Sequence, residues 1–368
     1  MSIVNDYENS ILGIPNSILK HFGAKTHHAT LPVLDERLSR GYKNVVLLVL
    51  DGMGLVILKA HAPDGFLMRN YVSPLNSLYP CTTSSMLTTF ETGLTPIEHG
   101  WLGWSLYFEE IGKCVDVFSG NESGTNRPAA ERNIVTESIG YNNLFTQIRE
   151  VNRTIECCSV SPFGDYRCNT NESICNQIET LCKTGGRRYI YAYYSQPDMD
   201  MHFSGCYSER AKADMVLFEK QIEQLSEQLT DTILIVTADH GMIDIKSLLI
   251  EDYPDIGECL AVRPTREPRC LSFFVKPEFK EIFPERWNAQ FGNDFLLMTG
   301  TEAYDKGVFG KGTPHKYAKS YLGDYVAIAI GNLALWYRFE NGKTLKFKAG
   351  HAGLTPDEMI VPLIIVER

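Results

Sequence analysis

Short apolar runs that end at polar residues recur along the chain, and each of them predicts a β-strand. Between these runs, residues 172–184 and 209–229 carry apolar side chains at three- and four-residue spacing, the period of an amphipathic helix. Strands that alternate with helices predict an α/β fold with a mostly parallel central sheet and helices on both of its faces. The predicted strands span residues 44–50, 154–160, 188–194, 232–236 and 325–330.

Two stretches interrupt this alternation. Residues 105–128 contain Gly112, Gly120 and Gly124 and are predicted to be rich in loops. Residues 250–317 are rich in proline and in short segments, which predicts a small inserted cap or lid beside the sheet. Because the sequence shows no internal repeat, low-complexity tract or clear linker, we expect residues 1–368 to form a single domain that carries this insertion.

The composition excludes several classes of protein. The chain has 368 residues, of which 44% are hydrophobic and 22% are charged, and its formal net charge is −10. The longest purely aliphatic run, at residues 45–50, is far shorter than the ~20 residues that cross a bilayer, so no membrane span is expected. The negative charge repels polyanions and argues against binding to a nucleic-acid duplex, so an anionic substrate needs a locally positive site.

The N-terminal residues and the cysteines both favour a cytoplasmic protein. Residues 1–16 include Asp6 and Glu8 and lack a basic start followed by an apolar core, so they are not typical of a secretory signal. The ten cysteines include no Cys-x-x-Cys pair, and Cys168, Cys175 and Cys182 are spaced like a buried stripe. We therefore expect reduced thiols.

Acidic and imidazole side chains follow the carboxyl ends of predicted strands, where open α/β sheets bind ligands. Asp51 ends the first strand, and Asp239 and His240 follow the strand at residues 232–236. Taken singly, each has a plain structural interpretation, such as a turn aspartate or a buried histidine. Together they are unexpected without a ligand, because unpaired groups of this kind would repel one another or stay unsatisfied.

Two further groups extend this pattern. Asp198 and His202 follow the strand at residues 188–194, and their i, i+4 spacing places them on one face of a helical turn. Asp200 is a competing ligand, although in a helix it faces away from His202. His351, between Gly350 and Gly353, lies near the last strand.

The resulting set of three carboxylates and three imidazoles is enough for two divalent cations. Mixed nitrogen and oxygen ligands favour zinc first and manganese second. Two divalent ions would more than offset the charges of Asp51, Asp198 and Asp239, which leaves a site with a net charge of +1 in an acidic chain. Such a site would attract a phosphate.

A cluster of hydroxyls at residues 82–85 supplies candidate nucleophiles. Thr82, Thr83, Ser84 and Ser85 follow Pro80 and read as the start of a helix, a position that favours anions. A plain capping cluster is the alternative interpretation. The hydroxyls become reactive only if a metal lowers their pKa.

In combination, these residues resemble the alkaline phosphatase superfamily, and within it the type I phosphodiesterase and nucleotide pyrophosphatase family. The resemblance extends over residues 44–366, with its motifs in the order of that family. Its segments are Asp51-Gly52, Tyr79-Pro80-Cys81-Thr82-Thr83, Thr92-Gly93-Leu94-Thr95-Pro96, His99-Gly100, Pro197-Asp198 with His202, Thr237-Ala238-Asp239-His240-Gly241-Met242, and Gly350-His351.

The resemblance implies an alkaline-phosphatase-like fold and a two-metal phosphoester hydrolase. It implies that Thr83 is the nucleophile and forms a covalent phosphothreonine-type intermediate, which water then hydrolyses. His99 matches a family histidine that is not a ligand, so we expect it to be structural. One zinc ion would be held by Asp51, Thr83, Asp239 and His240, and the other by Asp198, His202 and His351.

The sequence departs from the family pattern at one point. Nucleotide pyrophosphatases of this family carry an asparagine shortly after the His-Gly pair that helps to hold a non-bridging phosphate oxygen, and residues 101–106 contain none. The candidates for this role are Ser105, Lys311, His315 and a backbone N–H at the start of the Thr83 helix. Nearby aromatic residues would either stack on a base or aryl leaving group or pack in the core, namely Trp101, Trp104, Tyr107 and Phe108.

We therefore predict a phosphodiesterase or nucleotide pyrophosphatase with a small-molecule phosphoester substrate, most of all a nucleotide. The missing asparagine leaves open a phosphomonoesterase or phosphonate hydrolase with the same metal site. A non-catalytic nucleotide-sensing module is a further alternative, which metal content would distinguish. Cofactor-independent phosphoglycerate mutases share the metal frame, but they need a serine nucleophile and a large inserted domain. A homodimer is compatible with the sequence.

Overall fold

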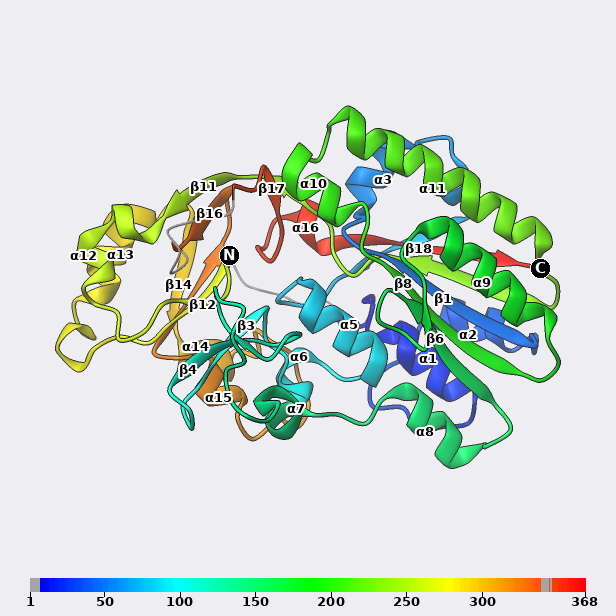
Figure 1. The fold of residues 1–368 in the computed structure, drawn as a ribbon, viewed down its shortest axis with the longest axis horizontal. Coiled ribbons are helices and arrows are strands. Elements are labelled where there is room, and N and C mark those ends of the chain that lie inside the picture. Colours follow the sequence, from blue (N-terminus) through cyan, green and yellow to red (C-terminus); the bar gives the residue numbers. More distant parts are fainter. Residues whose placement is uncertain (1–6, 339–343, 345) are drawn as a thin grey trace.

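Two seven-stranded sheets occupy opposite ends of the long axis of the molecule (Figure 1). The structure is a computed structural model that describes residues 7–338, 344 and 346–368. The central sheet lies at the right of Figure 1, where the C-terminus is, and the second sheet lies at the left.

The central sheet has the strand order β2-β18-β9-β1-β8-β6-β7. Strand β1 pairs in parallel with β8 and with β9, and β18 runs antiparallel to β2 and to β9. The predicted α/β fold with a mostly parallel sheet is confirmed. The strands are β1 (Asn44–Leu50), β2 (Tyr71–Asn76), β6 (Glu156–Ser161), β7 (Tyr166–Arg167), β8 (Arg188–Tyr194), β9 (Thr232–Thr237) and β18 (Ile360–Glu367).

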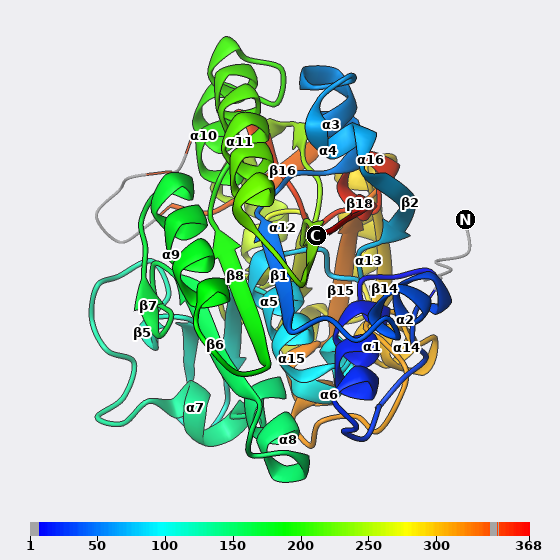
Figure 2. The same ribbon diagram turned by 90° about the vertical axis from the view of Figure 1, so that its right-hand side faces the viewer.

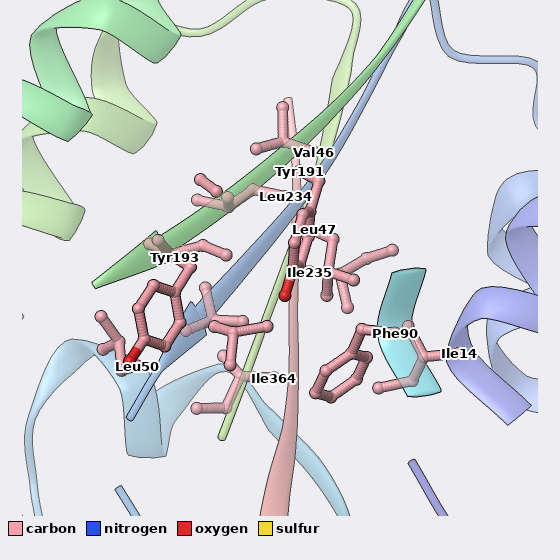
Figure 3. Close-up of a cluster of buried hydrophobic side chains, with 14 of the residues drawn as sticks. Ile14, Val46, Leu47, Leu50, Phe90, Tyr191, Tyr193, Leu234, Ile235 and Ile364 are labelled. Carbon is pink, nitrogen blue, oxygen red and sulfur yellow. The ribbon is translucent and has the colours of Figure 1, made fainter. Parts of the chain in front are cut away.

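The inner strands are continuous apolar runs because both faces of the sheet are buried. Every residue of β1 and of β9 is buried. In the register of this pair, Leu47 lies beside Ile235. Figure 3 shows both side chains on the face of the sheet on which Phe90 and Ile14 lie. The continuous apolar pattern of residues 44–50 and 232–236 therefore indicates two strands that are buried on both faces of the sheet.

Helices cover both faces of the central sheet (Figures 1 and 2). The long helix at residues 209–228 packs along the helix at residues 171–183, and the helix at residues 13–21 packs against that at residues 83–92. Around this sheet lie α1 (Gly13–His21), α2 (Pro32–Leu38), α3 (Leu55–His61), α4 (Phe66–Arg69), α5 (Thr83–Thr92), α6 (Pro96–His99), α8 (Leu144–Val151), α9 (Asn171–Lys183), α10 (Asp198–Ser204), α11 (Glu209–Gln228) and α16 (Pro356–Met359).

The second sheet is antiparallel and has the order β14-β15-β13-β12-β3-β4-β5. Its strands come from three parts of the chain: β3 (Ser105–Phe108), β4 (Lys113–Asp116), β5 (Asn121–Glu122), β12 (Thr265–Glu267), β13 (Cys270–Phe273), β14 (Phe295–Thr299) and β15 (Tyr325–Ala329).

Two expectations about this region differ from the structure. The apolar run at residues 325–330 forms a strand, but it belongs to the second sheet, because an apolar run of five or six residues fits either sheet equally well. Residues 105–128 were expected to be loop-rich, yet they contain three short strands of this sheet. Gly112 and Gly120 have φ values of +62° and +69° and mark the turns after β3 and β4.

Both faces of the second sheet are buried at β15. Val326 and Ile328 of β15 belong to one apolar cluster, and the alternate residues Ala327 and Ala329 belong to another. The elements of this half are α7 (Ile134–Ile139), η1 (Ile250–Asp252), α12 (Pro254–Gly257), η2 (Pro277–Phe279), α13 (Phe283–Phe291), α14 (Gly300–Asp305) and α15 (Ala318–Tyr321). Residues 250–317 thus share a sheet with residues 105–122 and 325–329, and their role as a cap stays a prediction.

Two small two-stranded ladders accompany the large sheets. Strands β10 (Ile243–Asp244) and β17 (Ala349–Gly350) pair antiparallel, and β11 (Lys246–Leu249) and β16 (Leu333–Trp336) pair in parallel. Along the described ranges, no helix is long and apolar enough to cross a membrane. The ten cysteines all lie in the described part of the chain and are free thiols.

A fully buried ion pair joins the two halves of the molecule. Arg269, between β12 and β13, binds both carboxylate oxygens of Glu358 in α16 at 2.7 Å. The same guanidinium donates to the carbonyls of Leu333 and Gly331 at 2.7 and 2.8 Å. The guanidinium of Arg269 therefore holds the carboxylate of Glu358 and two backbone carbonyls in one place.

We expect Arg269→Met to lower the free energy of unfolding by about 3–5 kcal/mol, because it leaves the Glu358 carboxylate buried and unpaired. Urea denaturation followed by circular dichroism measures this loss. Lys20→Met is the control, since Lys20 pairs with Asp35 at 2.6 Å but is 58% exposed, and we expect a loss below about 1 kcal/mol. Equal losses for the two variants would contradict the role given to the buried pair.

Candidate active site

The predicted ligands lie at the carboxyl edge of the central sheet, on the side that faces the second sheet (Figure 1). Asp51 directly follows β1, Asp239 follows β9 by two residues, and Asp198 begins α10 after β8. These three strands are neighbours in the sheet, so their carboxyl ends lie side by side. The parallel sheet is thus the reason that residues nearly 200 positions apart come together.

Asp51, Asp239 and His240 form one cluster, which we call the first cluster. Their ligand atoms lie within 4.8 Å of one another, and all three residues are buried. His240 Nε2 lies 3.4 Å from Asp51 Oδ1 and 3.4 Å from Asp239 Oδ2. The second oxygen of Asp239 accepts hydrogen bonds from the N–H groups of Gly52 and His240 at 3.1 and 3.0 Å, which fixes the carboxylate.

Asp198, His202 and His351 form the second cluster, again with ligand atoms within 4.8 Å of one another. His202 Nε2 lies 3.3 Å from Asp198 Oδ2, and His351 Nε2 lies 3.8 Å from Asp198 Oδ1. The rings of His240 and His351 stack with centroids 3.8 Å apart, so the two clusters are adjacent. The structure therefore brings together the six side chains in the two groups that the resemblance implied.

The three histidines have the tautomer that a metal ligand needs. Their Nδ1 atoms lie next to backbone carbonyls, 2.8 Å from Ala349 for His202, 2.9 Å from Gly241 for His240 and 3.2 Å from Cys81 for His351. Because a carbonyl oxygen only accepts, each Nδ1 carries the proton. Each Nε2 lone pair is therefore directed toward the carboxylates, an arrangement that a shared cation would stabilise.

The carboxylates show the same need for a cation. Asp51 Oδ1, Asp198 Oδ1 and Asp239 Oδ2 are buried and have no hydrogen-bond partner among the described residues. Burial and the charges of Asp239 and Asp198 raise the pKa of Asp51 well above its usual value. Burial acts in the same direction at Asp198, but His202, His351 and His240 outweigh it and lower the pKa of that carboxyl. The residues present therefore fit two divalent cations, one in each cluster.

The backbone between the two clusters is close-packed. Gly52 has a φ of +71°, and a Cβ atom there would lie 2.9 Å from the Cβ of Asp198. The N–H of Asp198 donates to the carbonyl of Asp51 at 3.0 Å. The glycine after Asp51 is thus required for the second cluster to approach the first.

Thr83 is the first residue of α5, and its hydroxyl is directed toward the first cluster. Oγ1 lies 3.3 Å from His240 Nε2. The side chain is largely buried, with 9% of its surface exposed, and that part lines a cavity. The free N–H groups at the start of a ten-residue helix favour an anion at this position.

The cavity has a volume of about 660 Å³, within the range of small-molecule sites. Thr83 and the second cluster line one part of it. Aromatic rings form one wall of the cavity. Phe347 stacks on His202 with ring centroids 4.3 Å apart, and it packs edge-on against Trp336 with centroids 5.2 Å apart. The remaining walls include residues of the second sheet and of the loop after β5, among them Asp116, Ser123, Asn126, Thr265 and Glu267.

The structure separates the predicted substrate contacts into two groups. Ser105 and Trp104 line the cavity, and Trp104 is 46% exposed. Lys311 and His315 are not among the lining residues: the Lys311 carbonyl accepts from Thr95 Oγ1, and the His315 N–H donates to the carbonyl of Ile97. Both are thereby held against α6, away from the clusters.

Other candidates have structural contacts. Asp200 accepts from Arg210 Nε at 2.9 Å and lies outside both clusters. His99 is buried, accepts from the N–H of Trp101 at 3.1 Å and lies 3.2 Å from Thr89 Oγ1. Trp101 and Phe108 pack in an apolar core, and Tyr107 packs against Phe274.

Sequence reasoning did not identify two side chains at the site. Tyr193 donates a hydrogen bond to Asp51 Oδ2, and Glu267 lines the cavity while its Oε1 accepts from Thr82 Oγ1 at 2.6 Å. A polar residue near the end of a buried strand was a signal for Tyr193. Glu267 is one acidic residue in an irregular stretch, and no pattern distinguishes it from its neighbours.

The fold and a family model together define a phosphoester hydrolase of the alkaline phosphatase superfamily. The model described as "Type I phosphodiesterase / nucleotide pyrophosphatase" matches residues 45–263, more than half of the chain. This chain belongs to that family, which confirms the predicted resemblance. A search of curated proteins found no match.

Solved structures share the fold at low sequence identity. Human ectonucleotide pyrophosphatase / phosphodiesterase 5 superposes with a TM-score of 0.66 at 13% identity, over 88% of this chain and 87% of that chain. An inactive form of the murine protein, in complex with AMP, superposes with a TM-score of 0.61 at 14% identity, over 87% of each chain. Phosphonoacetate hydrolase from Sinorhizobium meliloti 1021, in complex with phosphonoformate, superposes with a TM-score of 0.64 at 15% identity. The superposition covers 87% of this chain and 89% of that chain.

Proposed function

We propose that this protein is a zinc-dependent phosphodiesterase or nucleotide pyrophosphatase with Thr83 as its nucleophile. The observation that carries this proposal is the position of the Thr83 hydroxyl. It lies at a helix N-terminus, 3.3 Å from His240 Nε2, and lines a cavity together with the second cluster. A hydroxyl that serves only to cap a helix has no reason to face the metal-type ligands of the first cluster, all three of which are buried.

The ligand set assigns one cation to each cluster. Asp51, Asp239 and His240, with Thr83, would hold the first, and Asp198, His202 and His351 the second. When bound, the two cations supply the positive charge that lowers the pKa of the Thr83 hydroxyl and neutralises the phosphate oxygens. Mixed nitrogen and oxygen ligands favour zinc, with manganese as the second choice.

The reaction has two displacements at phosphorus. In the first, Thr83 Oγ1 releases its proton to solvent and bonds to phosphorus, while the bond to the leaving-group oxygen breaks and that oxygen departs with the electron pair. In the second, a water molecule loses a proton as its oxygen bonds to phosphorus, and the bond to Oγ1 breaks. Oγ1 keeps the electron pair and takes up a proton, which restores the threonine. The N–H groups at the start of α5 face the phosphoryl oxygens during both steps.

The cavity supports a substrate with a flat leaving group. Phe347, Trp336 and Trp104 provide aromatic surfaces on which a base can stack. The volume of about 660 Å³ accommodates a nucleotide. The complex of a structural neighbour with AMP agrees with this substrate class.

A phosphonate hydrolase is the second candidate. Residues 101–106 lack the asparagine of the nucleotide pyrophosphatases, and a structural neighbour of similar TM-score is a phosphonoacetate hydrolase. The same nucleophile and ligand clusters would serve this activity, with different contacts to the remaining phosphorus substituent.

Initial rates on two chromogenic esters test the proposal. For the zinc-loaded protein we expect faster hydrolysis of bis(p-nitrophenyl) phosphate than of p-nitrophenyl phosphate, with both rates lost on addition of EDTA and restored by zinc. A preference for the monoester would identify a phosphatase instead. If both esters are inert while two zinc ions are bound, phosphonoacetate is the next substrate, and its hydrolysis would replace the diesterase assignment by the second candidate.

A further inference from the structure

Glu267 is a buried carboxylate in the cavity wall, and it belongs to neither metal cluster. It ends β12, it lines the cavity and only 9% of its surface is exposed. Burial raises the pKa of Glu267 to about 7. A carboxyl group is costly to bury in this way, so its contacts require an explanation.

The contacts of Glu267 join three distant segments. Oε1 accepts from Thr82 Oγ1 at 2.6 Å and from the N–H of Trp104 at 2.9 Å. Thr82 immediately precedes the nucleophile, and Trp104 immediately precedes β3 of the second sheet. One oxygen atom thus connects the start of α5 to two strands of the opposite sheet.

The hydroxyl of Thr82 makes an unusual hydrogen bond for an N-cap residue. Thr82 is the N-cap residue of α5, with extended backbone angles of φ −140° and ψ 148°. A threonine at an N-cap normally accepts a hydrogen bond from an N–H of the first turn, but Thr82 makes no such bond. Its hydroxyl donates to Glu267 instead, so this contact orients the first turn of α5 relative to the second sheet.

We propose that Glu267 is a positioning residue for Thr83. By holding Thr82, it fixes the first turn of α5 so that Thr83 Oγ1 stays 3.3 Å from His240 Nε2. This inference rests on the function proposed above. It assigns to the second sheet a part in aligning the nucleophile, in addition to forming the cavity wall.

Two substitutions separate hydrogen bonding from charge. We expect Glu267→Ala to lower kcat by about 10- to 100-fold with KM changed less than about threefold, because displacement of a nucleophile by about 1 Å has an effect of this size. Glu267→Gln keeps an oxygen that accepts from Thr82 and Trp104, so it should restore kcat to within about threefold of the wild type. Equal losses in the two variants would overturn the positioning role.

Glu219 provides the matched control for buried carboxylates. It is 7% exposed and accepts from the N–H of Leu67 at 3.0 Å, on the far helix α11. We expect Glu219→Ala to lower the melting temperature while kcat stays unchanged. If Glu219→Ala and Glu267→Ala lower kcat equally, the effect of Glu267 is general destabilisation and the proposal fails.

A double-mutant cycle tests whether Glu267 acts through Thr82. We expect Thr82→Val to lower kcat. The double variant, with Thr82→Val and Glu267→Ala, should have a kcat no lower than that of the less active single variant. Losses that multiply in the double variant would show that the two residues act independently, against the proposal.

Crystal structures of the zinc-loaded wild type and Glu267→Ala give a readout that does not depend on turnover. We expect the distance from Thr83 Oγ1 to His240 Nε2 to increase in Glu267→Ala and to stay unchanged in Glu267→Gln. If the wild type hydrolyses no phosphorus ester, the proposed function fails, and these distances alone decide the role of Glu267. An unchanged distance in Glu267→Ala would overturn the inference while leaving the proposed function intact.

Discussion

Thr83→Ala is expected to abolish turnover of bis(p-nitrophenyl) phosphate, with kcat reduced by about 10⁴-fold or more, as for the loss of a covalent nucleophile. The fold should be nearly unchanged, because Thr83 is only the first residue of α5 and its removed hydroxyl faces the first cluster. Zinc content should also stay near that of the wild type, since three other side chains hold the first cluster. Initial rates, metal analysis and melting temperature measure the three effects.

Ser84 is the matched control for this experiment. It follows Thr83 in the same helix turn, is fully buried, and its Oγ has no hydrogen-bond partner among the described residues. We expect Ser84→Ala to keep wild-type rates. If Thr83→Ala retains activity while Ser84→Ala or Thr82→Ala loses it, Thr83 is not the nucleophile. Mass spectrometry of quenched wild-type enzyme should locate the covalent phosphoryl group on the peptide that contains Thr83.

The two side-chain clusters could be predicted because the parallel sheet relates sequence to space in a simple way. Asp51, Asp198 and Asp239 each follow a buried strand, and parallel neighbours bring their carboxyl ends to one edge. Each strand was visible as a continuous apolar run. The grouping into two clusters came from the family resemblance, since periodicity alone does not show which residues share a cation.

The cavity wall could not be predicted in the same way. The second sheet is antiparallel and takes its strands from residues 105–122, 265–299 and 325–329, so its pairing depends on contacts that no local pattern records. The contact between Glu267 and Thr82 spans 185 positions. Lys311 was a candidate contact to a non-bridging phosphate oxygen, yet its carbonyl accepts a hydrogen bond from Thr95 at α6. The position of such loops follows from tertiary packing.

Removal of metal is expected to have the second large effect, on stability as well as on rate. In the EDTA-treated protein, Asp51 and its neighbours hold like charges in a buried site, which raises the pKa of Asp51 and disfavours its charged form. Zinc at 100 times its dissociation constant should stabilise the fold by about 2.7 kcal/mol per site, seen as a rise in melting temperature. Metal analysis should find two zinc ions per chain, whereas a nucleotide-sensing module need not hold them.

Asp51→Asn should separate repulsion from metal binding. Without metal, we expect this variant to be at least as stable as the wild type, because a neutral amide replaces a carboxylate beside Asp239. With zinc, it should bind about one ion per chain and lose most of the gain in melting temperature. Asp200→Asn is the control, since Asp200 binds Arg210 outside both clusters, and it should keep two ions. Two ions in Asp51→Asn, or one in Asp200→Asn, would show that the clusters are wrongly assigned.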